Sequence, residues 1–396
     1  MGEASLSAEP TTIGGAAPTA GVLPDTSQAP GLPALVSETV PFSDPARLIA
    51  KPTASDGGAC YRRAEGLLDG VCQRVHVLTI DPASDAVSVR PMLSFDRLFG
   101  YETLTVMDAR LDALASANGG FGPPDGRPGG AVMINGVFLS PADARFPVLI
   151  IGNREASLSP LRTEVVLIAD GIRHAADFLN PWPMTAGLAV YTPAYGSTDR
   201  LEADHLAVVV SKGLVTGIVS GGSPVSIPSD GFLAVAVGTE QRTRLRGMFP
   251  VGTKASWQTN AWPELPEGSR HLMSCGSLLV HEGKAVAPES DPWAGSLAAP
   301  APRSAVGIGR EGQLVFFVAE GRIPGGASGF SGKALSRLLV DMGLVEAALL
   351  DGGASSEMIV HHEIRNKLSA GRERKLPSGF ALVPRQGSDE RTDEKQ

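Results

Sequence analysis

The sequence predicts an α+β fold in a single domain, with a large, mixed and mostly antiparallel sheet and packed helices. Many apolar segments are short and alternate with polar residues, as half-buried strands do. Strand and helix signals do not alternate regularly along the chain, which disfavours a doubly wound parallel sheet. The 47 Gly and 31 Pro among 396 residues indicate many turns and short elements.

Composition divides the chain into three parts. Residues 1–45 are rich in Ala, Pro, Thr, Ser and Gly and lack periodicity, so they are predicted to be a disordered leader or linker. Residues 387–396 are charged and polar and are predicted to form a disordered tail. The folded domain is expected over 46–386, since 43% hydrophobic and 19% charged residues are typical of a globular chain.

Strands and one helix are expected in the first half of this domain. Residues 74–80 and 86–92 both alternate polar and apolar side chains and are predicted to pair antiparallel. Apolar residues at helical spacing predict a helix over 104–117. A Gly- and Pro-rich loop over 119–130 then leads into an apolar strand at 131–134.

Hairpins dominate the middle of the chain. Further strands are predicted over 206–210, 214–219, 232–237, 305–308 and 314–318. Residues 240–270 are less regular and are expected to be mostly loop. The segment Gly307-Ile308-Gly309-Arg310-Glu311-Gly312 matches a dinucleotide fingerprint, but a strand follows it instead of the required helix. A hairpin turn is therefore predicted there.

The clearest helix precedes a glycine-rich turn. Ser331 is a good N-cap, and Gly343 stands where a left-handed C-cap would. Between them a single apolar stripe is formed by Leu335, Leu338, Leu339 and Met342. A short buried strand at 346–350 is expected next, leading directly into Asp351.

Charge and hydropathy exclude several classes of partner. The net charge is −8 and no basic block is present, which argues against nucleic acid. No apolar run approaches the ~20 residues that span a bilayer, so no membrane span is predicted. No signal peptide is visible, but the Pro-, Ala- and Thr-rich leader suits secretion after processing, so an extracytoplasmic location is expected. Nothing in the sequence sets an oligomeric state.

The three cysteines, Cys60, Cys72 and Cys275, fit no zinc-binding pattern. Cys60 and Cys72 enclose a short loop and could form a disulfide in an oxidising compartment. Separate free thiols are the equal alternative.

Three segments place a polar residue at a predicted strand end beside glycine. They are Asn135-Gly136, Pro302-Arg303-Ser304 and Asp351-Gly352-Gly353-Ala354-Ser355-Ser356. Glycine lets a ligand approach the backbone and frees N–H groups for an anion. Each segment could also have a purely structural role. Asn135-Gly136 could be a hairpin turn, Arg303 a surface residue, and Asp351-Gly352-Gly353 only a turn. Together, with the helix that precedes Asp351, they indicate a site.

These segments resemble the phosphodiester glycosidase family. Its members carry an Asn-Gly-Gly-Phe-Phe-like strand end, then Pro-Arg-Thr-Ala-x-Gly, then Leu-Asp-Gly-Gly-Gly-Ser-Ser. Ala319-Glu320-Gly321-Arg322 is similar to a further family stretch, and the resemblance runs over about 70–384. The departures are Val137 for the second Gly, Ser304 for Thr, Glu320 for Asp and Ala354 for Gly.

The resemblance implies a catalytic domain that hydrolyses the bond between a sugar's anomeric carbon and a phosphodiester oxygen. Free sugar and a phosphomonoester would be released from a small-molecule or glycan substrate bearing a sugar-1-phosphate, and no metal or cofactor is required. Arg303 would hold the phosphodiester, Asp351 would act as a base or stabilise the transition state, and Asn135 would orient the sugar or phosphate. The expected substrate-binding residues are Gly136, Arg322, Glu320, Gly352, Gly353, Ser355 and Ser356. Glu320 or Glu357 is the candidate second carboxylate.

Two alternatives stay open. A non-catalytic glycan-binding or cell-surface module on the same fold is favoured by Val137, which removes the second Gly of the first motif. A hydrolase that acts on another bond of phosphodiesters is the other. The sequence shows no His/Asp cluster, and most phosphodiester hydrolases use metal ions.

Overall fold

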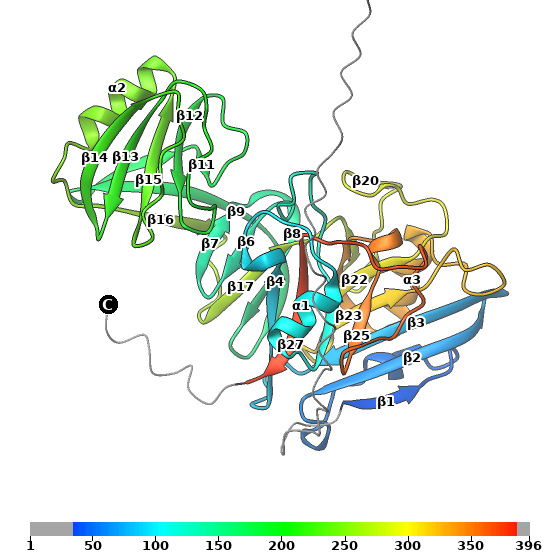
Figure 1. Cartoon of the computed structure of the whole chain (residues 1–396). Coiled ribbons are helices and arrows are strands. Elements are labelled where there is room, and N and C mark those ends of the chain that lie inside the picture. Colours follow the sequence, from blue (N-terminus) through cyan, green and yellow to red (C-terminus); the bar gives the residue numbers. More distant parts are fainter. Residues whose placement is uncertain (1–34, 386–396) are drawn as a thin grey trace, which may run out of the picture. The chain divides into compact units, whose positions relative to one another are not determined.

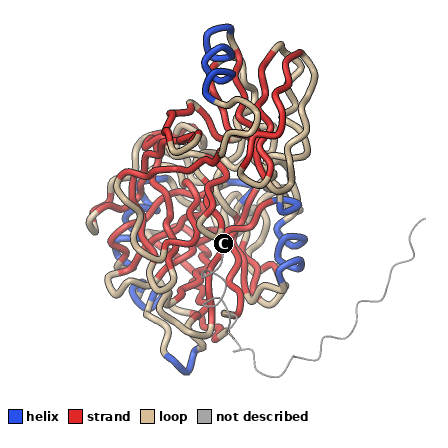
Figure 2. The backbone as a smooth tube through the Cα atoms, turned by 90° about the vertical axis from the view of Figure 1, so that its left-hand side faces the viewer, coloured by secondary structure: helices blue, strands red, loops and turns tan. Residues whose placement is uncertain are grey.

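The computed structural model describes residues 35–385 (Figure 1). Of these residues, 46% lie in strands and 12% in helices. The predicted α+β fold with packed helices is therefore wrong, because the fold is mostly β and is divided among several sheets (Figure 2). The described residues form three α-helices of 8 to 11 residues: α1 (Leu104–Leu111), α2 (Thr239–Met248) and α3 (Gly332–Met342). They are too short and too few to make a helical layer.

The largest sheet has eight strands, which come from residues 36–80 and 278–350. In order across the sheet they are β1 (Val36–Thr39), β2 (Ala59–Leu68), β3 (Val71–Ile80), β23 (Leu314–Ala319), β22 (Arg303–Gly309), β24 (Leu344–Leu350), β18 (Leu278–His281) and β19 (Lys284–Ala285). The central strands β3, β23, β22 and β24 are mutually antiparallel. This sheet brings the segments around Arg303 and Asp351 side by side.

A second sheet has seven strands. These are β10 (Ile172–Ala176), β9 (Ala156–Ala169), β8 (Asp143–Gly152), β17 (Ser269–Ser274), β6 (Val132–Ile134) and β7 (Val137–Ser140), with β16 (Ala255–Trp262) also paired to β9. A five-stranded sheet consists of β11 (Phe178–Leu179), β12 (Gly187–Tyr191), β15 (Gly231–Val237), β13 (His205–Ser211) and β14 (Leu214–Gly221).

A fourth sheet connects the chain's C-terminal strand to its first half. Its strands are β26 (Glu363–Ile364), β25 (Met358–Val360), β5 (Ala115–Asn118), β27 (Ser378–Pro384) and β4 (Val87–Leu93). A short ribbon of β20 (Ser290–Asp291) and β21 (Gly295–Ser296) completes the strands. Residues 74–80 and 86–92 were expected to pair, but β3 pairs with β2 and β23, whereas β4 pairs with β27.

One apolar core is shared by three of the sheets. Phe316 of the eight-stranded sheet, Met273 of the seven-stranded sheet and Phe380 of β27 all belong to it. On the other face of the eight-stranded sheet, α3 packs its leucines against Phe317 and its neighbours. The helix is confirmed as predicted: the Ser331 side chain accepts a hydrogen bond from the Ala334 N–H (3.2 Å), and Gly343 adopts φ 99°.

Two segments differ from the prediction. The helix expected over 104–117 stops at Leu111, because Asp112 takes a left-handed φ of 47° and Ala115–Asn118 is drawn into a sheet between β25 and β27. Residues 240–270, expected to be mostly loop, contain α2 and β16. In both, sheet partners distant in sequence override local propensity.

Two smaller predictions are also decided. The segment Gly307 to Gly312 forms the predicted hairpin between β22 and β23. All three cysteines are free. On the β2–β3 hairpin Cys60 pairs with Thr79 and Cys72 with Leu67, at opposite ends of the ladder, so the disulfide alternative is wrong.

The predicted domain bounds lie partly outside the described residues, which exclude 1–34 and 386–396. Within the segment predicted as leader, Val36–Thr39 forms β1 and pairs parallel to β2. The division at 45 and 387 stays a prediction. Across 35–385, no helix is both long and apolar enough to cross a membrane.

Candidate active site

Three strand ends meet at one edge of the large sheet. Because Ser304 is paired with Leu350 across β22 and β24, the first residues of β22 lie beside Asp351, which follows the last residue of β24. The end of β5 reaches the same place, since the Asp351 N–H donates to the Gly119 carbonyl (3.1 Å). This edge therefore gathers residues from three distant parts of the sequence.

A buried asparagine holds these strand ends together. The Asn118 side chain is fully buried and donates to the Asp351 carbonyl (2.7 Å). Its Oδ1 accepts from the Ser304 hydroxyl (2.8 Å) and from the Glu357 N–H (3.1 Å). Both ends of the loop from Asp351 to Glu357 are thus fixed to β5.

Sequence reasoning missed this asparagine. Asn118-Gly119-Gly120-Phe121 spells the Asn-Gly-Gly-Phe strand end of the family pattern, which was assigned instead to Asn135. Because residues 104–117 are predicted to be helical, no strand is predicted to end at Asn118. The sequence itself carries a signal, because Gly120 is the second glycine of this tetrapeptide, whereas Val137 stands at the corresponding position after Asn135.

Two arginines flank the glycine turn. Arg303 is buried, and its Nε and Nη2 donate to the carbonyls of Phe330 (3.0 Å) and Ala299 (3.2 Å). Burial first, and then the positive charge of Arg322, lower the pKa of Arg303. A guanidinium whose pKa is lowered by a second cation is one that a bound anion would stabilise.

The turn itself runs directly against these arginines. A Cβ at Gly353 would lie 3.7 Å from Nη1 of Arg322, and one at Gly352 would lie 3.1 Å from the Pro302 carbonyl. Gly353 also has a φ of 65°, which favours glycine. Its N–H is used within the protein, donating to the Pro302 carbonyl (2.9 Å). Ala354 lies within the single 3-10 turn Gly353–Ser355 and has no positive φ, so it replaces glycine without strain.

Asp351 occupies a partly buried position beside this turn. Burial raises the pKa of its carboxyl, while Ser355 and the positive charge of Arg374 oppose the rise. The Ser356 hydroxyl is buried and has no hydrogen-bond partner among the described residues. Asp351, Ser355, Gly352, Gly353, Arg303 and Arg322 are therefore brought together as the sequence predicted.

Glu320 lies near this group, but its carboxylate is engaged by the protein. It accepts from His76 Nε2 (3.1 Å) and from the Lys367 N–H (2.8 Å), and it lies 3.4 Å from Arg74 Nη1. Burial alone would raise its pKa, but His76 and these other partners outweigh burial and lower the pKa of Glu320. This carboxylate thus ties the Arg322 loop to the segment that carries Arg374.

Glu357 behaves differently. Its side chain is fully buried beside Glu373, whose carboxylate accepts from the Thr105 N–H (3.1 Å) and hydroxyl (2.9 Å). Burial, together with the charge of Glu373, raises the pKa of Glu357 to about 9. At neutral pH Glu357 is therefore a protonated acid.

Asn135 and Gly136 lie elsewhere. They form the tight turn between β6 and β7, with φ values of 51° and 78°, as the hairpin alternative predicted. Hydrogen bonds connect this turn to Arg270 and His271 of β17. No hydrogen bond or ion pair of the described residues joins it to Asp351 or either arginine. Val137 is exposed on β7 and cannot narrow the site around Asp351.

An aromatic pair borders the glycine loop after β5. Phe121 stacks on Trp293, with ring centroids 6.2 Å apart and an angle of 7° between the planes. Trp293 is 39% exposed and lies against Gly129, where a Cβ would come within 2.8 Å of the ring. The Asp291 carboxylate accepts a hydrogen bond from the backbone N–H of Trp293 (2.7 Å), which holds the backbone at this residue. Aromatic side chains are frequent in the lining of small-molecule sites.

No cluster of three or more His, Cys, Asp or Glu side chains able to hold a metal ion is found within residues 35–385. The site consists instead of one carboxylate, two guanidinium groups, hydroxyls and a glycine turn.

Solved structures share the fold of this chain. A hypothetical protein from Synechocystis superposes with a TM-score of 0.70 at 24% identity, over 82% of this chain and 62% of that one. A candidate exported protein from Burkholderia pseudomallei gives 0.64 at 22% identity, over 79% and 74% of the two chains. At these identities the likeness shows the fold alone.

A curated relative and a family match address the sequence directly. The prophage-derived uncharacterized protein YomE of Bacillus subtilis is 33% identical over 110 residues, which is 28% of this chain and 17% of that protein. The phosphodiester glycosidase family matches residues 204–383, which include Arg303, Arg322 and Asp351. The resemblance seen in the sequence is thus confirmed: residues 204–383 carry a domain of the phosphodiester glycosidase family.

Proposed function

We propose that this chain hydrolyses the bond between a sugar's anomeric carbon and a phosphodiester oxygen, releasing free sugar and a phosphomonoester. The family match supports phosphodiester glycosidase activity in general. The observation that supports the specific reaction is the meeting of Asn118, Ser304 and Asp351 beside two arginines. The two arginines lie against the glycine turn that follows Asp351, and such a grouping suits a substrate that has both a sugar and a phosphodiester.

Arg303 and Arg322 are proposed to bind the phosphodiester. Arg322 is exposed at its loop and can reach a ligand, whereas Arg303 is held rigidly by two carbonyls. Phosphate is a good leaving group, and cations that bind the departing oxygens stabilise the charge that develops on them. Such a pair takes over much of the work that a carboxylic acid performs in an ordinary glycosidase.

Asp351 is proposed to act as a base toward water or to stabilise the oxocarbenium-like transition state. Its position, fixed through the backbone by Asn118 and Gly119, is the rigid placement that such a role requires. Its partial burial strengthens electrostatic interactions with a bound sugar.

The second carboxylate is not needed in this scheme. Glu320 has protein partners for both oxygens, and Glu357 is buried behind the loop as a neutral acid. Both are proposed to position the loops that carry Arg322 and Arg374. Asn135 is replaced in the proposal by Asn118, which orients Asp351 through the backbone and does not touch substrate.

The reaction can be tested with a panel of sugar-1-phosphodiesters that includes UDP-N-acetylglucosamine. Free sugar and phosphomonoester are measured for the wild type, Asp351→Asn and the control Asp341→Asn, which changes an exposed aspartate of α3. Release by wild type and control, with a loss of ~100-fold or more in Asp351→Asn, is expected.

Release of phosphate ester without free sugar would instead identify a hydrolase of the phosphorus–oxygen bond. Binding without any product, from protein shown to be folded by circular dichroism, would point to a glycan-binding module. The support for that module from Val137 is gone, because Gly119-Gly120 supplies the glycine pair at the site.

We also propose that the protein acts outside the cytoplasm. The composition of its leader and the description of the Burkholderia relative of the same fold as a candidate exported protein support this location. Fractionation of the native organism's cells, followed by immunodetection, tests it.

A further inference from the structure

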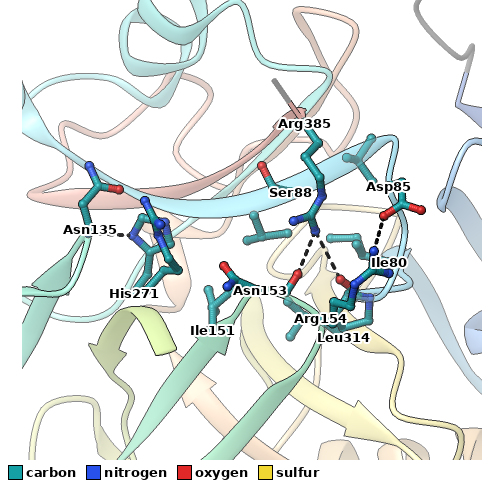
Figure 3. Close-up of a pocket in the computed structure, with 15 residues that line it drawn as sticks. Ile80, Asp85, Ser88, Asn135, Ile151, Asn153, Arg154, His271, Leu314 and Arg385 are labelled. Atoms are coloured by element: carbon teal, nitrogen blue, oxygen red, sulfur yellow. Dashed lines mark hydrogen bonds and ion pairs between the residues drawn. The ribbon is translucent and has the colours of Figure 1, made fainter. Parts of the chain in front are cut away.

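A cavity lies away from the glycine turn. It has a volume of about 550 Å³ and is lined by Asn135, Asn153, Arg154, His271 and Arg385 among others (Figure 3). Leu314 lies in its wall and pairs with Ile80, whereas Arg303 pairs with Ala319. The cavity is therefore at the opposite end of β22 and β23 from Arg303.

The lining of this cavity is cationic. Three guanidinium groups, those of Arg154, Arg270 and Arg385, face one carboxylate, that of Asp85. Asp85 is engaged by Arg154, with an N···O distance of 2.5 Å (Figure 3). The Arg385 guanidinium donates to three backbone carbonyls, those of Pro82, Ser84 and Asn153. Carbonyls orient a guanidinium without neutralising it, and neither Arg385 nor Arg270 forms an ion pair with a carboxylate among residues 35–385.

A β-bulge in strand β17 places Arg270 at the cavity. The register of β17 against β8 shifts between Ser269 and His271, which makes Arg270 the bulged residue. Bulges commonly re-aim a side chain beside a functional site. Arg270 forms no ion pair with a carboxylate among residues 35–385, so its charge is available to a ligand.

Neutral polar groups complete the lining. Asn135, Asn153, Ser88 and His271 provide amide, hydroxyl and imidazole groups, and Figure 3 shows them around the same space as Arg385. The Asn135 backbone N–H donates to His271 Nδ1 (3.3 Å), which holds the turn against β17. None of the fifteen lining residues is Phe, Tyr or Trp, so a nucleobase would find no aromatic side chain other than this imidazole to stack on. Apolar residues such as Ile80 and Leu314 also line the cavity and are each only 1% exposed.

We propose that this cavity is a second, non-catalytic site that binds a sugar phosphate. Arg270 and Arg385 would hold the phosphate, and the asparagines and Ser88 would bond the sugar hydroxyls. Its volume is within the ~300–1,000 Å³ range of small-molecule sites. The proposal is independent of the reaction at Asp351.

The test is isothermal titration of the full chain with glucose 6-phosphate, whose phosphate is not on the anomeric carbon. It is therefore not a substrate of the proposed reaction. Glucose and inorganic phosphate serve as the two partial probes. Arg270→Gln is expected to weaken binding by about tenfold or more, and Arg270→Lys by less. Asn135→Gly keeps the left-handed turn while removing the amide, and a loss of about threefold is expected.

Arg322→Gln alters the glycine-turn site alone and should leave this affinity unchanged. Retained binding in Arg322→Gln with the losses above supports the second site. No binding of glucose 6-phosphate at about 10 mM, or a loss in Arg322→Gln but not in Arg270→Gln and Asn135→Gly, overturns it. Equal affinity for inorganic phosphate and glucose 6-phosphate would overturn the sugar subsite.

Discussion

Replacing Glu357 with glutamine is expected to stabilise the folded protein increasingly as the pH rises. In the wild type, burial and the neighbouring Glu373 raise the pKa of Glu357 from 4.5 to about 9. Glutamine has nearly the shape of the protonated acid, but it cannot ionise. The substitution therefore removes one titration and little else.

The sign follows from proton binding. Between the unfolded pKa and the raised folded pKa, the folded state keeps a proton that the unfolded chain has released. The free energy of unfolding of the wild type then falls as the pH rises, by a tenfold change in the folding equilibrium for each pH unit. Between pH 6 and pH 8 the free energy of unfolding of the variant should rise by about 3 kcal/mol relative to that of the wild type.

Urea unfolding of both proteins at several pH values from about 5 to about 8.5 measures this difference directly. The control is Glu267→Gln, at an exposed glutamate, which should track the wild type at every pH. Two parallel stability curves would refute the reasoning, because they would mean that Glu357 is ionised in the fold or has the same pKa unfolded. A variant that loses stability with rising pH faster than the wild type would refute it equally.

Three further predictions concern the glycine-turn site. Asn118→Ala removes one donor and one acceptor from three buried partners, so we expect urea unfolding to show a loss of about 3 kcal/mol. Arg322→Gln removes one cation from beside the turn, and steady-state kinetics should show kcat/KM reduced by ~100-fold with unchanged thermal stability. Trp293→Ala removes the ring that stacks on Phe121, and we expect KM to rise about tenfold while kcat changes little.

Each of these three predictions would be contradicted by a specific result. Unchanged stability of Asn118→Ala would show that the loop from Asp351 to Glu357 is held by other contacts. Wild-type kinetics of Arg322→Gln would remove that arginine from the phosphate site. A fall in kcat with constant KM in Trp293→Ala would place the ring in the chemistry instead of in binding.

Local signals predicted the part of the site that is continuous in sequence. The N-cap at Ser331, the apolar stripe of α3 and the left-handed Gly343 are set by residues within a few positions of each other. The same holds for the strand that ends before Asp351 and for the turn at Gly352 and Gly353. Each of these depends on intrinsic conformational preference, which a short stretch of sequence expresses.

Pairing between distant strands could not be predicted in this way. Residues 115–118 have low strand propensity, yet they form β5 because β25 and β27 supply partners more than 200 residues away. The expected pairing of 74–80 with 86–92 failed for the same reason, since β27 is the partner that β4 takes. Because these pairings were not predicted, helix content was overestimated and Asn118 was not recognised as part of the site.

The sequence by itself determined the family, the Arg303 and Asp351 segments and the glycine turn that joins them. Only the tertiary structure decided that Asn118 completes this site, that Glu320 is bound by His76, and that Asn135 faces a separate cavity. The physical reason is that a side chain's chemistry is carried by its own residue, whereas its partners, burial and charge are set by strands that meet across the fold.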